Sequence, residues 1–439
     1  MSNAVLGLIS LFVAVFGVLT GFPMAFIFIF VALVFGFIGI GHQVFYLLTY
    51  QFFSLMTNVE LASIPLFLFM GYILEQSGLM DRMFSALRMA MGRTKGSLYI
   101  IVLIVATVFA AATGIVGASV TVLGVMAAPM MIRSGYDTQL SAGTIAAGGT
   151  LGILIPPSVM LIVMGPLVGV PISDLFAGAI VPGLMLSTIY LIYTVIRCQL
   201  QPSLGPVLEH GTSKYSVGDK ARELMLGVIP IATVIMATLG LILAGVTTPT
   251  DAAATGAFAS LLLSLAYGRM DGRRLMFAAF RTMETTAFIM FLIGAANFFG
   301  AVFARLGSGN LITTTLTSLH VSPMVMLVLM LMLVFALGGP LEWIPIVLVV
   351  VPILLPVVKQ LGFDMLWFSI LVAVTLQSSW LTPPMALSAY FLKGVVPQWN
   401  MKDIYLGMVQ FVFLQAIVVA LLIKFPALVT WLPSVTGLQ

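Results

Sequence analysis

Two stretches of the chain place paired prolines beside hydroxyl, amide and glycine residues inside long uncharged runs. They read "GTLGILIPPSV" at 149–159 and "QSSWLTPPMAL" at 377–387. Proline lacks the backbone N–H and clashes with the preceding turn, which costs a helix interior about 3 kcal/mol or more. A lone proline in an apolar helix is most often a kink. Two matching pairs, each followed by a short segment with polar residues, instead predict two broken helices that serve a site.

A broken helix inside an apolar run predicts a polar site. In hydrocarbon, unpaired backbone groups persist only inside protein or beside a wet cavity. Free carbonyls and small hydroxyls are oxygen ligands that suit Na+, and the N-terminus of a half-helix carries a partial positive charge that favours an anion. Two glycine-rich turns are expected to meet the breaks, "AATGIVGAS" at 111–119 and "LGGPLEWIP" at 337–345.

The candidate ligands come from these four stretches. For a first Na+ site we expect Thr113, Gly114, Gly117, Ser119, Thr150, Gly152 and Pro156, and for a second Gly338, Gly339, Glu342, Gln377, Ser378 and Thr382. For the substrate we expect Ser119, Pro157, Ser158, Ser379 and Pro384. Each hydroxyl has an alternative role, because serine and threonine commonly bond the backbone of their own helix. Glu342 is a functional candidate, because it is a charged residue predicted at membrane depth. Alternatively, it lies at the edge of the membrane and caps the hairpin.

The composition indicates the elements that position these residues. Of the 439 residues, 61% are hydrophobic and 7% are charged, whereas a soluble domain carries about a quarter charged residues. Uncharged runs such as 1–59 and 306–341 are each long enough for at least one membrane span. The chain is therefore expected to be an all-α polytopic membrane protein. Its N-terminus has no basic segment, which argues against a cleaved signal peptide.

Several classes of function find no support in the residues. The single cysteine, Cys198, excludes a disulfide framework or a thiolate metal cluster. The stretch "GRTKGS" at 92–97 lacks the spacing of a phosphate-binding loop, so ATP-driven transport by this chain alone is not expected. No nucleophile–base pair lies at membrane depth, so the chain is not expected to be an enzyme. We expect no cofactor other than a coupling ion and no nucleic-acid partner.

The apolar pattern predicts eight full spans and four irregular segments. The spans lie near 4–20, 23–41, 61–79, 175–197, 224–246, 251–268, 284–305 and 404–424. Residues 97–132 and 321–358 are interrupted by glycine and proline, and residues 138–169 and 365–394 carry the proline pairs. The flanking segments 42–58 and 271–283 are expected to be amphipathic arms at the membrane interface, with plain connecting helices as the alternative. Glu284, where the second arm meets its span, is expected to pair with an arginine or to contact a partner chain.

Basic residues predict the orientation of these segments, because they favour the cytoplasmic side. All lysines and arginines except Arg305, Lys359 and Lys424 fall on one side if 97–132 enters and leaves by the same face. Residues 97–132 are then a re-entrant hairpin from the cytoplasm, and 321–358 are a matching hairpin from the other side. Both chain termini are expected outside the cytoplasm.

The two halves of the chain are related in sequence. "PMMIRSGYD" at 129–137 matches "PVVKQLGFD" at 356–364, and the proline pairs keep the same offset of 383 − 156 = 227 residues. Because equivalent segments face opposite sides, this is an inverted-topology repeat of two five-span halves, each with a re-entrant hairpin and a helix broken at Pro-Pro. Such repeats are typical of secondary transporters.

Several motifs in combination resemble one family. "APMM" at 128–131, "GTLGILIPPSV", "LEWIPIVLVVVPILLPVVKQLGFD" at 341–364 and "LTPPMALSAYFLKG" at 381–394 look like the large membrane subunit of a tripartite ATP-independent periplasmic (TRAP) transporter, DctM-like. "GVTTPTDAAATGA" at 245–257 resembles a turn of that family. We call the two glycine-rich turns, 111–119 and 337–345, the first and the second tip. The first tip departs from the family, because it reads Thr113-Gly114-Ile115-Val116 where members read like Ser-Gly-Ser-Ser. Glu342 stands where many members have Asp, and Thr375, a further substrate candidate, stands where many have Asn.

The resemblance implies a function and a set of partners. The chain would be a subunit of a Na+-coupled importer of small organic anions, such as carboxylates and keto or hydroxy acids, in the bacterial inner membrane. It would work with a small four-helix membrane subunit and a periplasmic solute-binding protein, by an elevator movement. The alternative is a stand-alone carboxylate or ion-transporter-type carrier that needs no binding protein; a purely structural membrane scaffold would leave the duplicated breaks unexplained.

The internal repeat and the resemblance together predict a division into domains, with the scaffold and transport parts implied by the resemblance. Residues 1–200 would form the first inverted repeat, with scaffold at 1–95 and 174–197 and a transport part at 97–169. Residues 201–223 would be a cytoplasmic linker. Residues 224–439 would form the second repeat, with scaffold at 224–320 and 403–424 and a transport part at 321–394.

Overall fold

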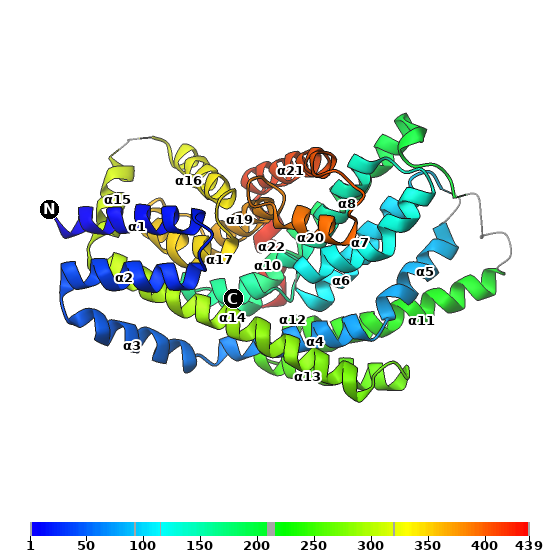
Figure 1. Ribbon diagram of the computed structural model, residues 1–439, viewed down its shortest axis with the longest axis horizontal. Coiled ribbons are helices and arrows are strands. Elements are labelled where there is room, and N and C mark those ends of the chain that lie inside the picture. Colours follow the sequence, from blue (N-terminus) through cyan, green and yellow to red (C-terminus); the bar gives the residue numbers. More distant parts are fainter. Residues whose placement is uncertain (1, 92–93, 115, 209–215, 319–320, 438–439) are drawn as a thin grey trace.

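The computed structural model describes residues 2–91, 94–114, 116–208, 216–318 and 321–437. Throughout these ranges the regular structure is helical. The helices form two groups, which we call the frame and the inner bundle (Figure 1). Three residues used in the sequence predictions, Ile115 of the first turn and the basic residues Arg93 and Lys214, lie outside the described ranges.

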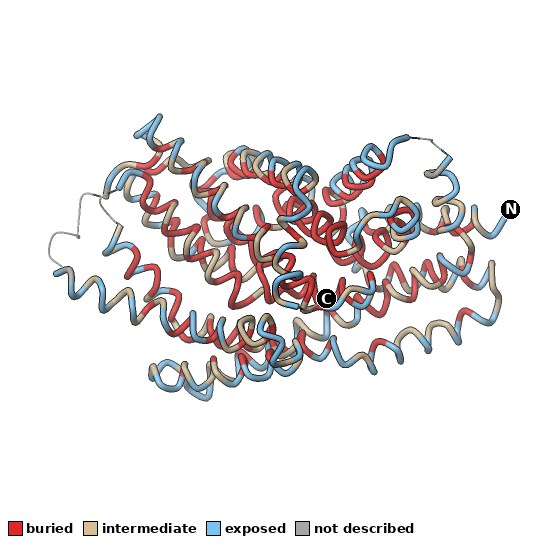
Figure 2. The backbone as a smooth tube through the Cα atoms, turned by 180° about the vertical axis from the view of Figure 1, so that it is seen from behind, coloured by how far each residue is buried: buried red, intermediate tan, exposed pale blue. Residues whose placement is uncertain are grey.

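The frame contains two runs of helices that pack on one another. It consists of α1 (Asn3–Leu19), α2 (Met24–Ile40), α3 (Gln43–Met56), α4 (Ser63–Gln76), α5 (Leu79–Met91), α11 (Val217–Ile235), α12 (Leu241–Leu243), α13 (Pro249–Ala266), α14 (Gly272–Arg305) and α15 (Ser308–Thr317). Helix α14 packs on α2, α3 and α4, while α13 packs on α4 and α11 packs on α5. Many frame residues are exposed, whereas burial is concentrated in the inner bundle (Figure 2).

The inner bundle contains the segments that carry the candidate site. It consists of α6 (Ser97–Thr113), α7 (Val116–Arg133), α8 (Thr138–Thr150), α9 (Val159–Val168), α10 (Ile172–Leu200), α16 (Pro323–Gly338), α17 (Trp343–Pro345), α18 (Val351–Gln360), α19 (Met365–Gln377), α20 (Leu387–Val395), α21 (Met401–Lys424) and α22 (Ala427–Thr436). Helix α10 packs on α6, α9, α19, α21 and α22, and α21 packs on α8, α19 and α20. Both long helices therefore belong to this bundle by their contacts.

The helices divide at the proline pairs. Helix α8 ends in a 3-10 turn, Leu151–Ile153, before the first pair, and α9 starts at Val159. Helix α19 likewise ends in a 3-10 turn, Ser378–Trp380, before the second pair. The Pro156–Pro157 and Pro383–Pro384 peptide bonds are both cis. The predicted breaks are thus present in the fold.

The related stretches upstream of each broken helix share a local structure. Gly135 and Gly362 adopt positive φ angles of 70° and 73°, which suit glycine at the end of a helix. Two residues later an aspartate caps the next helix. Asp137 Oδ1 accepts a hydrogen bond from Leu140 N at 2.7 Å, and Asp364 Oδ1 accepts one from Trp367 N at 2.7 Å. The sequence match therefore corresponds to the same turn-and-cap structure in both halves.

Several helices are suited to crossing a membrane. Among the described residues, six are long and apolar enough, and the bent pair Gln43–Met56 and Glu60–Gln76 adds a seventh if it counts as one span. That pair is bent by 59°, so the first arm is set off from its span as predicted. The second arm is not, because residues 272–305 form the single continuous helix α14. At 1.5 Å per residue, α14 is about 51 Å long and exceeds the roughly 30 Å hydrocarbon core.

Candidate functional site

The first turn packs directly on the first proline pair. Helix α6 ends at Thr113 and is capped by Gly114, which has a φ angle of 62°, a conformation that favours glycine. A Cβ atom at Gly114 would lie 2.5 Å from the Pro157 carbonyl oxygen, so only glycine permits this approach. Thr113 is buried beside it, and its hydroxyl donates a hydrogen bond to Phe109 O at 3.0 Å. The first tip and the first break therefore form one contact.

The same hairpin also reaches the second half of the chain. A Cβ atom at Gly117 would lie 2.9 Å from Cζ of Phe391, and one at Gly124 would lie 2.8 Å from Cγ2 of Val395. Both neighbours belong to α20, the half-helix that follows the second proline pair. Ser119 is buried in this hairpin. The first tip is consequently held between the two breaks.

The residues of the first break are buried. Thr150, Gly152, Pro156, Pro157 and Ser158 all lie inside the protein. The Thr150 hydroxyl donates to Ala147 O at 2.7 Å, and the Ser158 hydroxyl donates to Ile153 O. The backbone around the first pair is thus enclosed by protein, as irregular backbone at membrane depth requires.

The second turn packs on the second break in a similar way. Gly339 O accepts a hydrogen bond from Met385 N at 3.1 Å. A Cβ atom at Gly338 would lie 3.0 Å from Cβ of Ser379, and one at Gly339 would lie 3.3 Å from Pro383 O. Unlike the first pair, Pro383 and Pro384 are exposed. The second break is therefore covered on one side by its tip and open on the other.

The hydroxyls of the second break bond the backbone of their own helix. Thr375 donates to Leu371 O, Ser378 to Thr375 O, Ser379 to Leu376 O and Thr382 to Ser378 O, at distances of 2.8, 2.6, 2.6 and 2.8 Å. This is the alternative role considered from the sequence. Donation of the proton leaves the lone pairs of each oxygen available to accept, so the bond does not exclude a cation.

One side-chain contact joins the two breaks. Gln377 Nε2 donates a hydrogen bond to Thr150 Oγ1 at 3.0 Å, between residues at equivalent positions of the two related halves. Gln377 is fully buried, and its Oε1 atom has no hydrogen-bond partner in the described part of the chain. Candidates assigned from the sequence to two separate Na+ sites therefore lie in contact.

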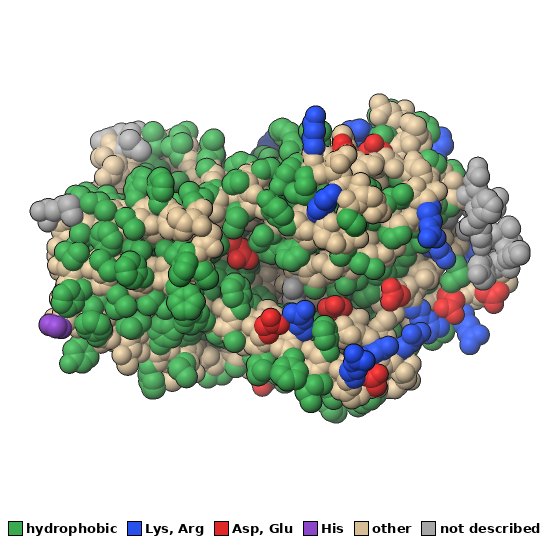
Figure 3. Space-filling model, in the orientation of Figure 1, with side chains coloured by type: hydrophobic (Ala, Val, Ile, Leu, Met, Phe, Trp, Pro, Cys, Tyr) green, Lys and Arg blue, Asp and Glu red, His purple; other side chains and the backbone are tan. Residues whose placement is uncertain are grey.

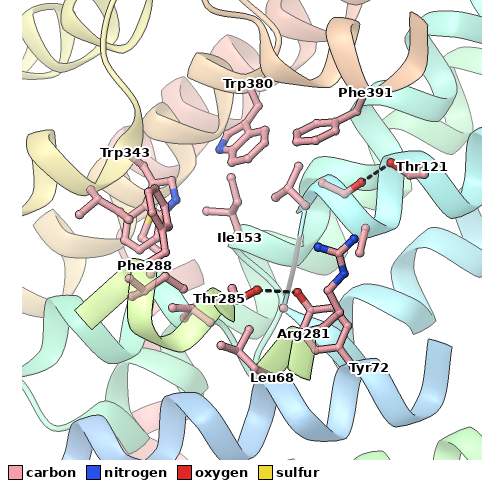
Figure 4. Close-up of a pocket in the computed structure, with 18 of the residues that line it drawn as sticks. Leu68, Tyr72, Thr121, Ile153, Arg281, Thr285, Phe288, Trp343, Trp380 and Phe391 are labelled. Carbon is pink, nitrogen blue, oxygen red and sulfur yellow. Dashed lines mark hydrogen bonds between the residues drawn. The ribbon is translucent and has the colours of Figure 1, made fainter. Parts of the chain in front are cut away.

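A cavity of about 460 Å³ opens beside the tips and breaks. Its inner-bundle wall comes from the first tip, α7, α9, α17, Trp380 and α20, and its frame wall comes from α4 and α14. Figure 4 shows the labelled side chains around this space, and Figure 3 shows charged side chains beside a hollow on that face of the molecule. We call it the central cavity. Its volume falls within the range of ligand pockets, about 300–1,000 Å³.

The central cavity brings charged groups of both walls together. Arg281 of α14 and Glu75 of α4 line it from the frame, and Glu342 lines it from the inner bundle. Arg281 Nη1 lies 2.8 Å from Glu284 Oε2, which confirms the predicted pairing of Glu284 with an arginine. Glu342 stands at the N-cap of α17 but makes no capping hydrogen bond with its side chain.

Sequence reasoning missed most of the cavity lining. The missed residues include Tyr72, Glu75, Arg281, Thr285, Phe288, Trp343, Trp380 and Phe391. Tyr72 Oη and Thr285 Oγ1 are hydrogen-bonded at 2.8 Å across α4 and α14 (Figure 4). An arginine within one turn of a glutamate at the start of a predicted span was the available signal for Arg281. The aromatic residues carried no signal, because the chain has 31 phenylalanines and five tryptophans throughout.

Comparisons with known proteins agree over nearly the whole chain. Residues 8–428 match the family described as the tripartite ATP-independent periplasmic transporter, DctM component. The chain is 29% identical over 351 residues to the C4-dicarboxylate TRAP transporter large permease protein of Pseudomonas aeruginosa, covering 79% of this chain and 80% of that protein. It is 26% identical over 417 residues to the sialic acid TRAP transporter large permease protein of Vibrio cholerae, covering 94% and 95%.

A solved structure shares the fold. The YdaH transporter of Alcanivorax borkumensis superposes with a TM-score of 0.64 at 17% sequence identity, covering 87% of this chain and 88% of that one. The relatives are transport permeases and not enzymes. Given the family match over residues 8–428, this chain belongs to the TRAP transporter family as a DctM component, a multi-pass membrane permease.

Proposed function

We propose that this chain is the permease of a Na+-coupled importer that moves small organic anions across the bacterial inner membrane. Its partners are a periplasmic solute-binding protein, which delivers the anion, and a small four-helix membrane subunit. The observation that carries the proposal is the contact of each hairpin tip with a proline break, at Gly114 with Pro157 and at Gly339 with Met385, beside the central cavity.

The donor set at the breaks fits Na+. Candidate ligands are backbone carbonyls at the tips and breaks, together with hydroxyl oxygens whose protons are committed to their own helices. The partnerless Gln377 Oε1, among the described atoms, adds a further oxygen beside Thr150. Na+ takes such neutral oxygen ligands, and its charge would favour a bound anion nearby. We therefore keep Thr113, Thr150, Gln377, Ser378 and Thr382 as the leading ion candidates.

The proposed movement is an elevator motion of the inner bundle against the frame. The tips, the breaks, α10 and α21 pack together, and the central cavity lies between this body and part of α4 and α14. We accordingly place α10 and α21 in the mobile part, rather than in the scaffold assigned to 174–197 and 403–424 from the resemblance. Their contacts with α6, α8 and α19 would otherwise have to break in every cycle.

The inverted repeat and the topology are part of the same proposal. The matching turn-and-cap structures at Asp137 and Asp364, and the breaks at equivalent positions, support a duplicated unit. The distribution of lysine and arginine supports opposite orientations of the two units and periplasmic chain termini.

Uptake into proteoliposomes that contain both membrane subunits tests the function. We expect accumulation of an organic anion to require an inward Na+ gradient and the binding protein. Equal uptake with K+ in place of Na+ would refute Na+ coupling. Uptake that does not need the binding protein would favour the stand-alone carrier, which the family membership does not favour.

A further inference from the structure

The walls of the central cavity are rich in aromatic rings. Trp380 and Phe391 stack with their ring centroids 6.3 Å apart and their planes 20° apart. Trp343 from the second tip and Phe288 from α14 lie on a neighbouring wall, and Tyr72 closes the frame side (Figure 4). Rings with exposed faces and edges bind apolar and aromatic groups by burial of area and by ring contacts. The cavity therefore offers a surface for an apolar body.

The charged residues of the cavity provide a partner for one ligand carboxylate and for no second one. Among its described lining residues, Arg281 is the cation, while Glu75 and Glu342 are carboxylates. Arg281 Nη1 donates to Glu284 Oε2 at 2.8 Å, and its other N–H groups have no hydrogen-bond partner among the described residues, which leaves them available to a ligand. A guanidinium binds one carboxylate with two parallel hydrogen bonds. A second carboxylate on the same ligand would face a lining with no further cation in the described residues and two like charges. A dicarboxylate is therefore disfavoured on electrostatic grounds.

We propose that the central cavity binds monocarboxylates with an aromatic or bulky apolar body, with Arg281 holding the carboxylate and Phe391 and Trp380 contacting the body. This inference rests on the proposed function, because it names the substrate class of that transporter. It also makes a residue of the frame, rather than of the breaks, the group that selects the anion.

Binding of radiolabelled phenylacetate to the purified full-length permease in lipid nanodiscs tests the proposal without a transport readout. We expect saturable binding that is displaced by hexanoate far better than by succinate. Arg281→Gln should weaken phenylacetate binding about 10- to 100-fold, the effect of losing hydrogen bonds to a charged partner. Arg281→Lys should recover part of this loss.

Two further variants separate the apolar contact from the charge. Phe391→Ala should weaken phenylacetate binding about threefold to tenfold, in line with the contribution of a ring contact. Arg273→Gln is the matched control, because Arg273 lies on the same helix, is exposed and does not line the cavity. It should leave binding unchanged. Thermal unfolding of each variant identifies any that fail to fold.

The outcomes distinguish this inference from the proposed function. Absence of saturable phenylacetate binding, tighter binding of succinate, or unchanged binding in both folded Arg281 variants would overturn the inference. None of these results would remove Na+-driven, binding-protein-dependent uptake of some other organic anion. Loss of Na+ coupling with phenylacetate binding intact would instead overturn the proposed function alone.

Discussion

Gly338 provides a sharp test of the close contact between the second tip and the second break. It is the last residue of α16, and no positive φ angle complicates a substitution there. A Cβ atom at this position would lie 3.0 Å from Cβ of Ser379, closer than the 3.5–4.0 Å optimum of two carbon atoms by at least about 0.5 Å. Valine would add two more methyl groups at the same point.

Overpacking of this kind typically costs about 1–3 kcal/mol. If the cost falls on the state in which tip and break are closed, the population of that state drops by about 5- to 150-fold, since 1.4 kcal/mol is a factor of ten. We expect Gly338→Val to reduce Na+-driven uptake within this range. Membrane insertion and assembly with the small subunit should be retained.

The matched control is Gly394→Val. Gly394 lies in α20, near the same break, but a Cβ atom there would meet no atom within 4 Å. Uptake by this variant should stay close to that of the wild-type protein, measured in proteoliposomes at equal protein content. Wild-type uptake by folded Gly338→Val would show that the tip is not closely packed during transport and would refute the reasoning.

Three other predictions address the ions, the repeat and the topology. Gln377→Leu should raise the Na+ concentration for half-maximal uptake at least about threefold, and an unchanged Na+ response would remove Gln377 from the ion site. Its thermal stability should change little, because the lost hydrogen bond to Thr150 contributes only about 0.5–1.5 kcal/mol. Asp137→Ala and Asp364→Ala should each lower the free energy of unfolding by about 1 kcal/mol, the usual contribution of an N-cap, and clearly unequal losses in denaturation would contradict equivalent caps. Single cysteines at Ser2 and Ser434, in a Cys198→Ser background, should react with a membrane-impermeant maleimide added to intact spheroplasts, and labelling only after lysis would reverse the predicted topology.

The breaks were predictable because their cause is local. Proline disrupts the interior of any helix, so the pairs Pro156–Pro157 and Pro383–Pro384 were enough to predict both helix breaks of the site from the sequence. The related stretches ending at Asp137 and Asp364 were predictable for the same reason, since glycine and aspartate dictate the turn and the cap within a few residues.

The composition of the cavity was not predictable, because it depends on packing between distant segments. Arg281 reaches the cavity only because α14 continues through the predicted arm and packs beside α4. Trp380 and Phe391 are residue types that also fill ordinary apolar cores. Only the folded structure shows that the two rings stack on one wall of the cavity. The contact between Thr150 and Gln377 likewise requires the two halves to be assembled.

We propose that the inner bundle moves against the frame during transport, and a cross-link between the two can test this movement. Gly71 of α4 faces the first tip, and a Cβ atom there would lie 3.1 Å from Cβ of Thr113, close to the separation of about 3.8 Å in a disulfide. In a Cys198→Ser background, the pair Gly71→Cys and Thr113→Cys should therefore cross-link on oxidation and tie the tip to the frame. The control pair, Ala106→Cys and Gly148→Cys, joins α6 to α8 inside the inner bundle at the same 3.1 Å distance.

Na+-driven uptake by these two proteins, before oxidation, after oxidation and after reduction, tests the claim most directly. Because Thr113 is also an ion candidate, the single variant Thr113→Cys is the reference for uptake by the pair. We expect oxidation to abolish uptake by the Gly71–Thr113 pair but not by Thr113→Cys, reduction to restore it to the level of Thr113→Cys, and the control pair to transport in all three conditions. Full uptake by the Gly71–Thr113 protein with the cross-link formed would contradict a movement of the inner bundle against the frame.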